Sequence, residues 1–138
     1  YGNLYNWAVV NDDRGVCPEG WHVPSDEEYV ILYEYLGGNE ELAGGKLKEA
    51  GYEHWNYYSD QISLETTNET GFTALSGGWF HQEYDGVEMG TSTYFWTSSE
   101  HSSNIATSWR LYYSHSQFTR ENSGGSKQYG YSIRCIKD

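Results

Sequence analysis

The chain has 138 residues, enough for one domain with a sizeable hydrophobic core. A formal net charge of −12 and only 8 dispersed Lys and Arg residues argue against binding to a phosphate backbone or an anionic membrane surface. No apolar run is long enough for a transmembrane helix. We therefore predict a single domain over residues 1–138, with no nucleic-acid partner and no direct membrane insertion. Aromatic residues make up 17% of the chain, so we expect them to supply much of the core area.

The first part of the chain combines a strand pattern with an irregular segment. Residues 1–10, YGNLYNWAVV, alternate in polarity and predict a strand. The turn NDDRG then leads into VCPEGWHVPS, whose prolines break any helix. The chain begins with Tyr1 and no signal peptide is visible, so we expect it to be part of a longer exported protein.

Two short helices are predicted next. Ser25 and Glu28 form the pattern of a capping box, which marks the start of the first helix. Its apolar stripe consists of Tyr29, Leu32, Tyr33 and Leu36. The pair Gly37-Gly38 ends this helix. Asn39 is expected to cap a second helix, EELAGGKLKEA, whose two adjacent glycines weaken it.

From residue 55 the helical pattern stops, and a long polar stretch with isolated aromatics follows. Its lack of periodicity predicts a functional or ligand-stabilised loop. Asp85-Gly86, between two short strand-like runs, predicts a two-residue hairpin. The segment TYFWTSS predicts a further strand. We expect Trp21, in the earlier segment WHVP, and Trp96, in FWTSS, to be largely buried in the core.

The chain is expected to end in an antiparallel meander. Its three predicted strands run from Trp109 to Tyr113, from Phe118 to Glu121 and from Tyr129 to Lys137. The fold class is therefore α+β, with two short helices against a small antiparallel sheet with long loops. Pairing of the first predicted strand with the last would bring Cys17 and Cys135 close together.

The terminal strands carry the candidate binding residues. If Trp109, Leu111 and Tyr113 face the core, the alternating residues Arg110, Tyr112 and Ser114 face outward. A surface rich in Tyr, Ser, Gly and Asn is typical of paratopes, although Tyr and Thr are also simply good strand formers. The candidate contact residues are Glu100, His101, Asn104, Arg110, Tyr112, His115, Gln117 and Arg120.

The sequence offers no motif for catalysis. The patterns H-E-x-x-H, G-x-S-x-G and C-x-x-C are absent, and the five histidines are not spaced as metal-ligand pairs. We predict that the protein is not an enzyme, with no metal site and no cofactor. Calcium is the one ion weighed as an alternative, but no recognised calcium loop supports it. A bridge between Cys17 and Cys135 would contribute roughly 4–5 kcal/mol, yet spacing alone leaves a disulfide and free buried thiols as equal alternatives.

Several segments together resemble a known bacterial family. They are LYNW, GVCPEGWHVPSDEEY, YLGG, AGGKLKE, NETGFTALSGG, FWTSSE and YGYSIRCIKD. In order and spacing they are similar to the Fibrobacter succinogenes major paralogous domain over essentially the whole chain. The resemblance implies a C-type-lectin-like fold, similar to the variable proteins of diversity-generating retroelements, and a disulfide between Cys17 and Cys135. It offers no catalytic residue to carry over.

The resemblance also implies a function and a location. We expect a non-catalytic display or adhesion domain of a bacterial surface or periplasmic protein, often associated with lipoproteins. It would recognise a protein or glycan ligand through its C-terminal strands and loops. The alternatives are a structural or stalk domain without a specific ligand and a calcium-dependent sugar-binding lectin.

Overall fold

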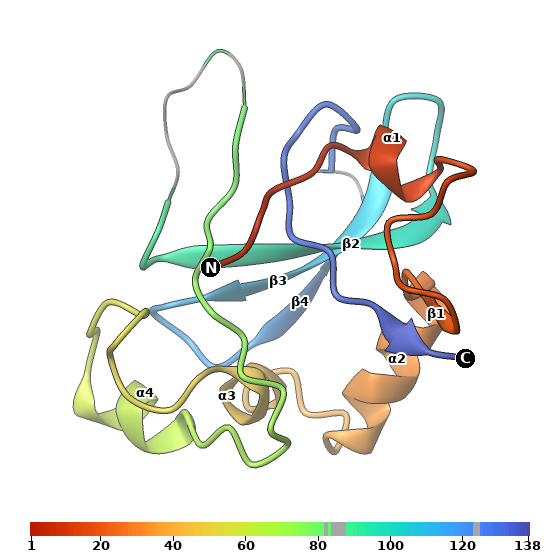
Figure 1. The fold of residues 1–138 in the computed structure, drawn as a ribbon. Coiled ribbons are helices and arrows are strands. Elements are labelled where there is room, and N and C mark those ends of the chain that lie inside the picture. Colours follow the sequence, from red (N-terminus) through yellow and green to blue (C-terminus); the bar gives the residue numbers. More distant parts are fainter. Residues whose placement is uncertain (82, 84–87, 123–124) are drawn as a thin grey trace.

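The computed structural model describes residues 1–81, 83, 88–122 and 125–138, and it has an α+β fold (Figure 1). In chain order the elements are α1 (Trp7–Val10), β1 (Trp21–His22), α2 (Asp26–Tyr35), α3 (Ala43–Leu47), α4 (Asp60–Glu65), β2 (Ser92–Glu100), β3 (Ala106–Tyr112), β4 (Phe118–Glu121) and β5 (Ile136–Lys137). The α+β prediction is confirmed. No helix in these described ranges is long and apolar enough to span a membrane.

Strands β2, β3 and β4 form the central antiparallel sheet. Phe95 pairs with Trp109, and the adjacent Tyr94 pairs with Arg110. Because successive side chains alternate between the faces of a sheet, these two pairs lie on opposite faces. In Figure 1, α2, α3 and α4 lie below the sheet, on the Trp109 face, and α1 lies above it with the segment 125–135.

Helix α2 covers the lower face of the sheet. Its predicted capping box is confirmed, because Ser25 Oγ accepts a hydrogen bond from the Glu28 amide and the Glu28 carboxylate accepts one from the Ser25 amide. Tyr29 and Leu36 of the predicted apolar stripe are buried. The ring of Tyr29 stacks against that of Trp109, with 6.0 Å between the ring centroids.

Helix α3 packs with its backbone against the turn between β3 and β4. The amide of Gly44 donates to the carbonyl oxygen of Ser116 at 2.7 Å, and a Cβ at Gly44 would overlap the backbone of that turn. Glycine therefore lowers the helix propensity here but permits the close approach. The predicted cap at Asn39 is wrong, because the Asn39 side chain accepts from the Glu41 amide in a turn and the helix begins later.

The upper face of the sheet is covered by a second hydrophobic cluster. Its buried members are Trp7, Trp96, Ala106 and Tyr131. Trp96 is fully buried, as predicted, and its indole N–H donates to the carbonyl oxygen of Tyr5 at 2.8 Å. The indole of Trp7 in α1 donates in turn to the carbonyl oxygen of Thr97 at 2.9 Å.

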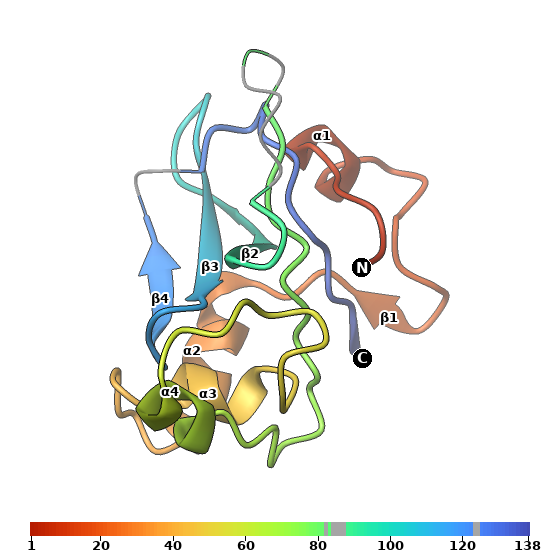
Figure 2. The same ribbon diagram turned by 90° about the vertical axis from the view of Figure 1, so that its left-hand side faces the viewer.

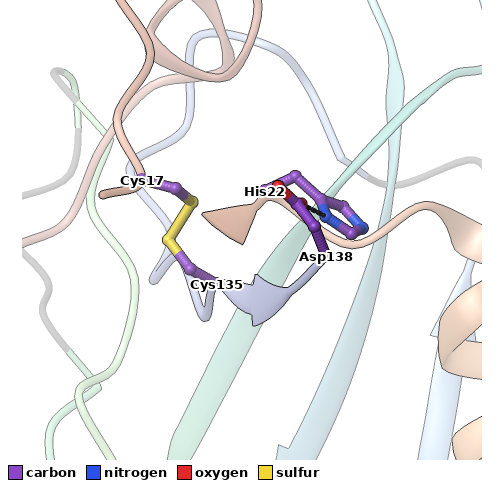
Figure 3. The surroundings of a disulfide bond; sticks show 4 residues. All are labelled: Cys17, His22, Cys135 and Asp138. Carbon is purple, nitrogen blue, oxygen red and sulfur yellow. Dashed lines mark hydrogen bonds and ion pairs between the residues drawn. A yellow bond between two sulfur atoms is a disulfide. The ribbon is translucent and has the colours of Figure 1, made fainter. Parts of the chain in front are cut away.

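The two ends of the chain are joined by a strand pair and a disulfide (Figure 3). Strand β1 pairs with β5 in an antiparallel ladder that lies apart from the central sheet (Figure 2). Beside it, Cys17 and Cys135 form a disulfide with 5.8 Å between their Cα atoms. The His22 ring bonds to Asp138 and Glu28, and these carboxylates raise its pKa. The disulfide indicates an oxidising, extracytoplasmic compartment.

Several predicted elements are corrected by the structure. The strand expected over residues 1–10 is reduced to one bridge, Tyr5 to Tyr131, because the chain turns into α1 and inserts Trp7 beside Trp96. The strand expected from Tyr129 to Lys137 is mostly isolated bridges, and only β5 is regular. Helix α4 lies in the stretch predicted as a loop.

Two further predictions concern Trp21 and the Asp85-Gly86 hairpin. Trp21 is 46% exposed, so its predicted burial is wrong. The ladder that carries it lies apart from the central sheet, and Trp21 belongs to neither hydrophobic cluster of the described residues. The hairpin predicted at Asp85-Gly86 lies outside the described residues.

We predict that breaking the disulfide destabilises the domain strongly. The two cysteines are 118 residues apart, so the bond restricts nearly the whole unfolded chain. Loop entropy for such a closure gives roughly 4–5 kcal/mol as an upper figure. Urea denaturation of the native protein with and without reductant measures this difference. A Cys17→Ser/Cys135→Ser variant should be insensitive to reductant, and equal stability of native and variant protein would contradict the prediction.

A matched pair of tryptophan variants tests the location of the core. Trp96→Ala should lower the free energy of unfolding by about 3–5 kcal/mol, because it removes a fully buried aromatic side chain. Trp21→Ala should cost about 1 kcal/mol or less, because that side chain is 46% exposed. Denaturation titrations of both variants provide the measurement. Similar losses for the two would refute this assignment of the core.

Candidate functional site

Two loop segments extend the central sheet beyond the free edge of β2. The amide of Ser132 donates to the carbonyl oxygen of Tyr94 at 2.9 Å, and the amide of Gly78 donates to that of Ser92 at 2.8 Å. Further along, Phe80 and Gly130 exchange two backbone hydrogen bonds of 3.0 and 2.8 Å. The residues next to these bonded positions are thereby held beside the upper face of the sheet.

These contacts create a groove lined by aromatic and charged side chains. Its volume is about 250 Å³. Of the described residues, those that line it are Trp79, Tyr94, Arg110, Glu121, Tyr129 and Tyr131. Tyr94 lies on β2, Arg110 on β3 and Glu121 at the end of β4. The other three residues lie on the loop segments. We refer to this site as the aromatic groove.

The aromatic side chains of the groove pack against one another. Tyr94 and Tyr131 are stacked, with ring centroids 4.7 Å apart and an angle of 15° between the planes. Tyr129 continues the row, 5.9 Å from Tyr131, and Trp79 lies 5.3 Å from Tyr129. Aromatic pairs at such separations stabilise one another beyond their buried area. The groove is therefore preorganised by its own side chains.

Arg110 is the only basic residue among the described lining residues. Its guanidinium pairs with the Glu121 carboxylate at 3.2 Å and lies 6.0 Å from the ring centroids of both Tyr94 and Tyr112. Arg110 Nε and the hydroxyl of Thr119, the residue paired with Arg110 on β4, are shielded from solvent. Neither atom has a hydrogen-bond partner within the part of the chain that the structure describes.

Two tyrosines of the groove, Tyr94 and Tyr131, are held in their neutral form. Burial raises the pKa of Tyr94, although the neighbouring Arg110 opposes this effect. Burial also raises the pKa of Tyr131, and the adjacent Tyr94 adds to the shift. Both phenols therefore remain protonated at neutral pH, when each can act as donor and acceptor.

Comparison with known families gives one match over nearly the whole chain. The family described as the Fibrobacter succinogenes major domain matches residues 1–137. The chain belongs to this family. No curated protein and no solved structure matches the chain. The aromatic groove, whose lining runs from Trp79 to Tyr131, lies entirely within the matched range.

Three of the predicted contact residues lie together in this Fibrobacter succinogenes major domain. Arg110 and Tyr112 share the upper face of β3, and Tyr112 stacks on His115 with 5.7 Å between ring centroids. Burial lowers the pKa of His115, with a smaller effect from Lys48, so the ring is neutral at neutral pH. These residues extend the groove along β3 toward the next turn.

A buried lysine supports that turn. The ammonium group of Lys48 donates to the carbonyl oxygens of Tyr112 and His115, the latter at 2.6 Å. It also lies 5.1 Å from the ring centroid of Trp55. Burial lowers the pKa of Lys48 to about 8. Lys48 therefore holds the end of β3 and the following turn in place from below the sheet. No sequence pattern predicted this role.

Arg120 lies on the other face of the sheet from Arg110. It pairs with Trp109 in the sheet register, and its guanidinium binds both carboxylate oxygens of the buried Asp26. The Trp109 indole donates to the same carboxylate at 3.0 Å. Gln117 donates to Glu41 at 3.0 Å, beside α3. The structure therefore does not bring Arg120 and Gln117 together with Arg110.

The other three predicted contact residues lie where β2 turns into β3. Glu100 pairs with the ammonium group of Lys127, and the Asn104 carbonyl oxygen accepts from the Lys127 amide at 3.0 Å. The amide of His101 donates to Ile105 across the turn. None of the three is among the described lining residues of the groove. Glu100 and Asn104 anchor the start of the segment that carries Tyr129.

The sequence patterns did not predict most of the residues that line the groove. Trp79, Glu121, Tyr129 and Tyr131 were not singled out, and neither was Tyr94. The alternation of β2 carried a usable signal for Tyr94, because it shares a face with Trp96 two residues later. The loop residues carried no periodic signal, since single backbone bridges place them.

Among the described residues, one group of side chains has the composition of a metal site. Ligand atoms of Glu49, Glu53 and His54 all lie within 4.8 Å of one another. His54 Nδ1 already pairs with the Glu49 carboxylate at 2.8 Å, and Glu53 is exposed. This hydrogen-bonded contact accounts for the arrangement of His54 and Glu49 without a cation.

The two arginines should differ sharply when replaced. Arg120→Ala leaves the Asp26 carboxylate buried without its cation, which should cost about 3 kcal/mol, the lower end of the roughly 3–5 kcal/mol range because the guanidinium is 44% exposed. Arg110→Ala removes a partly exposed ion pair and should cost less than about 1 kcal/mol. Denaturation of both variants measures this. A larger loss for Arg110→Ala would reverse the assignment of the faces.

Proposed function

We propose that this protein is a non-catalytic ligand-binding domain and that the aromatic groove is its binding site. The observation that carries the proposal is the combination of stacked aromatic rings with the Arg110–Glu121 pair in one concave site. Binding sites for small ligands are typically lined by aromatic side chains with a few oriented polar groups. The groove has this composition, and its side chains hold one another in place.

The chemistry of the groove favours binding over catalysis. A general acid or base needs a pKa near the working pH. Burial moves the pKa values of Tyr94 and Tyr131 away from neutrality, and Arg110 is paired with Glu121. Both cysteines are bound in the disulfide, so neither can act as a nucleophile.

The proposal extends to fold family and location. A C-type-lectin-like domain at the bacterial surface or in the periplasm agrees with the disulfide, the joined chain ends and the loop-built upper face. In such a domain the ligand would be a protein or a glycan. We further propose a similarity to the variable proteins of diversity-generating retroelements, which would make the rim residues of the site differ between related copies.

The proposal can be tested on an array that carries immobilised neutral glycans, anionic glycans and peptides. The native domain should bind at least one member. Arg110→Ala/Tyr129→Ala should lose that binding, because it removes the polar pair and one aromatic wall. The melting temperature should change by no more than a few degrees, because both side chains are only partly buried.

A matched control separates the groove from general surface effects. Arg14→Ala/Tyr35→Ala replaces the same two residue types at positions where the side chain of Arg14 is 90% exposed and Tyr35 is 82% exposed. This variant should bind like the native domain. Retained binding by the groove variant would place the site elsewhere, for example on the residues between Tyr57 and Gly71. Failure of the native domain to bind any member would favour a stalk role.

A further inference from the structure

We infer that the aromatic groove binds a neutral saccharide, with a sugar ring stacked on the aromatic wall and its hydroxyl groups bonded to Arg110 and Glu121 without a bridging metal ion. This inference rests on the proposed function and names the class of its ligand. The polar atoms of the groove, its aromatic wall, and its charge and size all favour this ligand.

The polar atoms of the groove match hydroxyl groups better than ions. The guanidinium of Arg110 offers donors and the adjacent carboxylate of Glu121 offers acceptors, 3.2 Å apart. A hydroxyl group both donates and accepts, so neighbouring hydroxyls can satisfy this pair together. An anion would satisfy only Arg110 and a cation only Glu121, and each would compete with the existing ion pair.

The aromatic wall suits the apolar side of a sugar ring. Tyr129 and Trp79 are only partly buried, and their planes meet at 58°. The faces of such rings carry partial negative charge and attract the polarised C–H groups of a pyranose. Because their ring centroids are 5.3 Å apart, the two rings form one continuous wall, and a sugar ring stacked on this wall is held in position while the Arg110–Glu121 pair fixes its rotation.

Charge and size set the remaining limits. The domain carries a formal net charge of −12, and the only cation among the described lining residues is neutralised by Glu121. A polyanionic glycan would therefore be repelled. The volume of about 250 Å³ lies just below the roughly 300–1,000 Å³ typical of small-ligand pockets, so the groove suits a ligand of one or two sugar units. A folded protein partner would need a much larger surface, on the order of 800 Å² on each side.

The inference is tested by titrating the native domain with a panel of oligosaccharides. The neutral probes are gluco-, galacto-, manno- and xylo-oligosaccharides, the anionic probe is oligogalacturonate, and a cationic and a tyrosine-rich peptide serve as non-sugar probes. Calorimetry should show saturable binding of at least one neutral oligosaccharide, unchanged by EDTA. Tyr129→Ala and Glu121→Gln should each weaken it at least tenfold, and Arg14→Ala/Tyr35→Ala should leave it unchanged.

The outcomes separate this inference from the proposed function. Binding of only the peptides or only oligogalacturonate, lost in Arg110→Ala/Tyr129→Ala, would overturn the neutral saccharide and leave a ligand-binding groove. Loss of sugar binding in EDTA would overturn the metal-free mode. Absence of neutral-sugar binding in the native domain would also overturn the inference, provided that a structured near-ultraviolet circular dichroism spectrum shows that the domain is folded. Glu121→Gln keeps the shape of the side chain, so its effect reports on charge and hydrogen bonding rather than on folding.

Discussion

The central sheet has two faces that both need apolar cover, and three of the four helices in the described residues lie on the lower face. Below the sheet, α2 and α3 provide a dense aromatic and aliphatic core. Above it, one short helix and two loop segments provide the cover, and the cluster there has fewer buried residues. Their cover is complete over Trp96 and ends near Tyr94 and Arg110. The aromatic groove is the place where this cover stops.

Loop segments can serve as cover only if their own polar backbone groups are satisfied. Here the edge of β2 supplies bonds to Ser132 and Gly78, and the pairing of Phe80 with Gly130 closes the two segments against each other. The disulfide at Cys135 fixes the chain a few residues further on. The positions of these two loop segments therefore depend on a small number of backbone hydrogen bonds and one disulfide, and not on helix or strand propensity.

The sequence predicted best where local pattern and tertiary environment agree. Helix α2 has a capping box and an apolar stripe, and its buried face is the predicted one. The phase of β3 followed from Trp109 and Leu111, which are both buried. Helix α4 was missed because its residues are mostly polar and none is buried, so no apolar stripe marked it.

The candidate site was predicted only in part, for a related reason. Arg110 and Tyr112 were placed on the upper face because they alternate with apolar residues on one strand. The same rule, applied to β4, puts Arg120 on the face of Phe118, where Asp26 binds it. Tyr129 and Tyr131 could not be predicted in this way, because single bridges between distant segments fix their positions and no periodic pattern accompanies such contacts.

The residues of the groove differ in how closely they are tied to folding. Tyr131 and Tyr94 stack on each other, and Tyr131 also lies 4.3 Å from the ring of the fully buried Trp96. Replacing either would disturb the upper cluster as well as the site. Trp79 and Tyr129 lie at the outer end of the row, and they can change with less effect on the core. A domain built in this way can alter its ligand preference at the rim while the inner pair keeps the upper layer packed on the sheet.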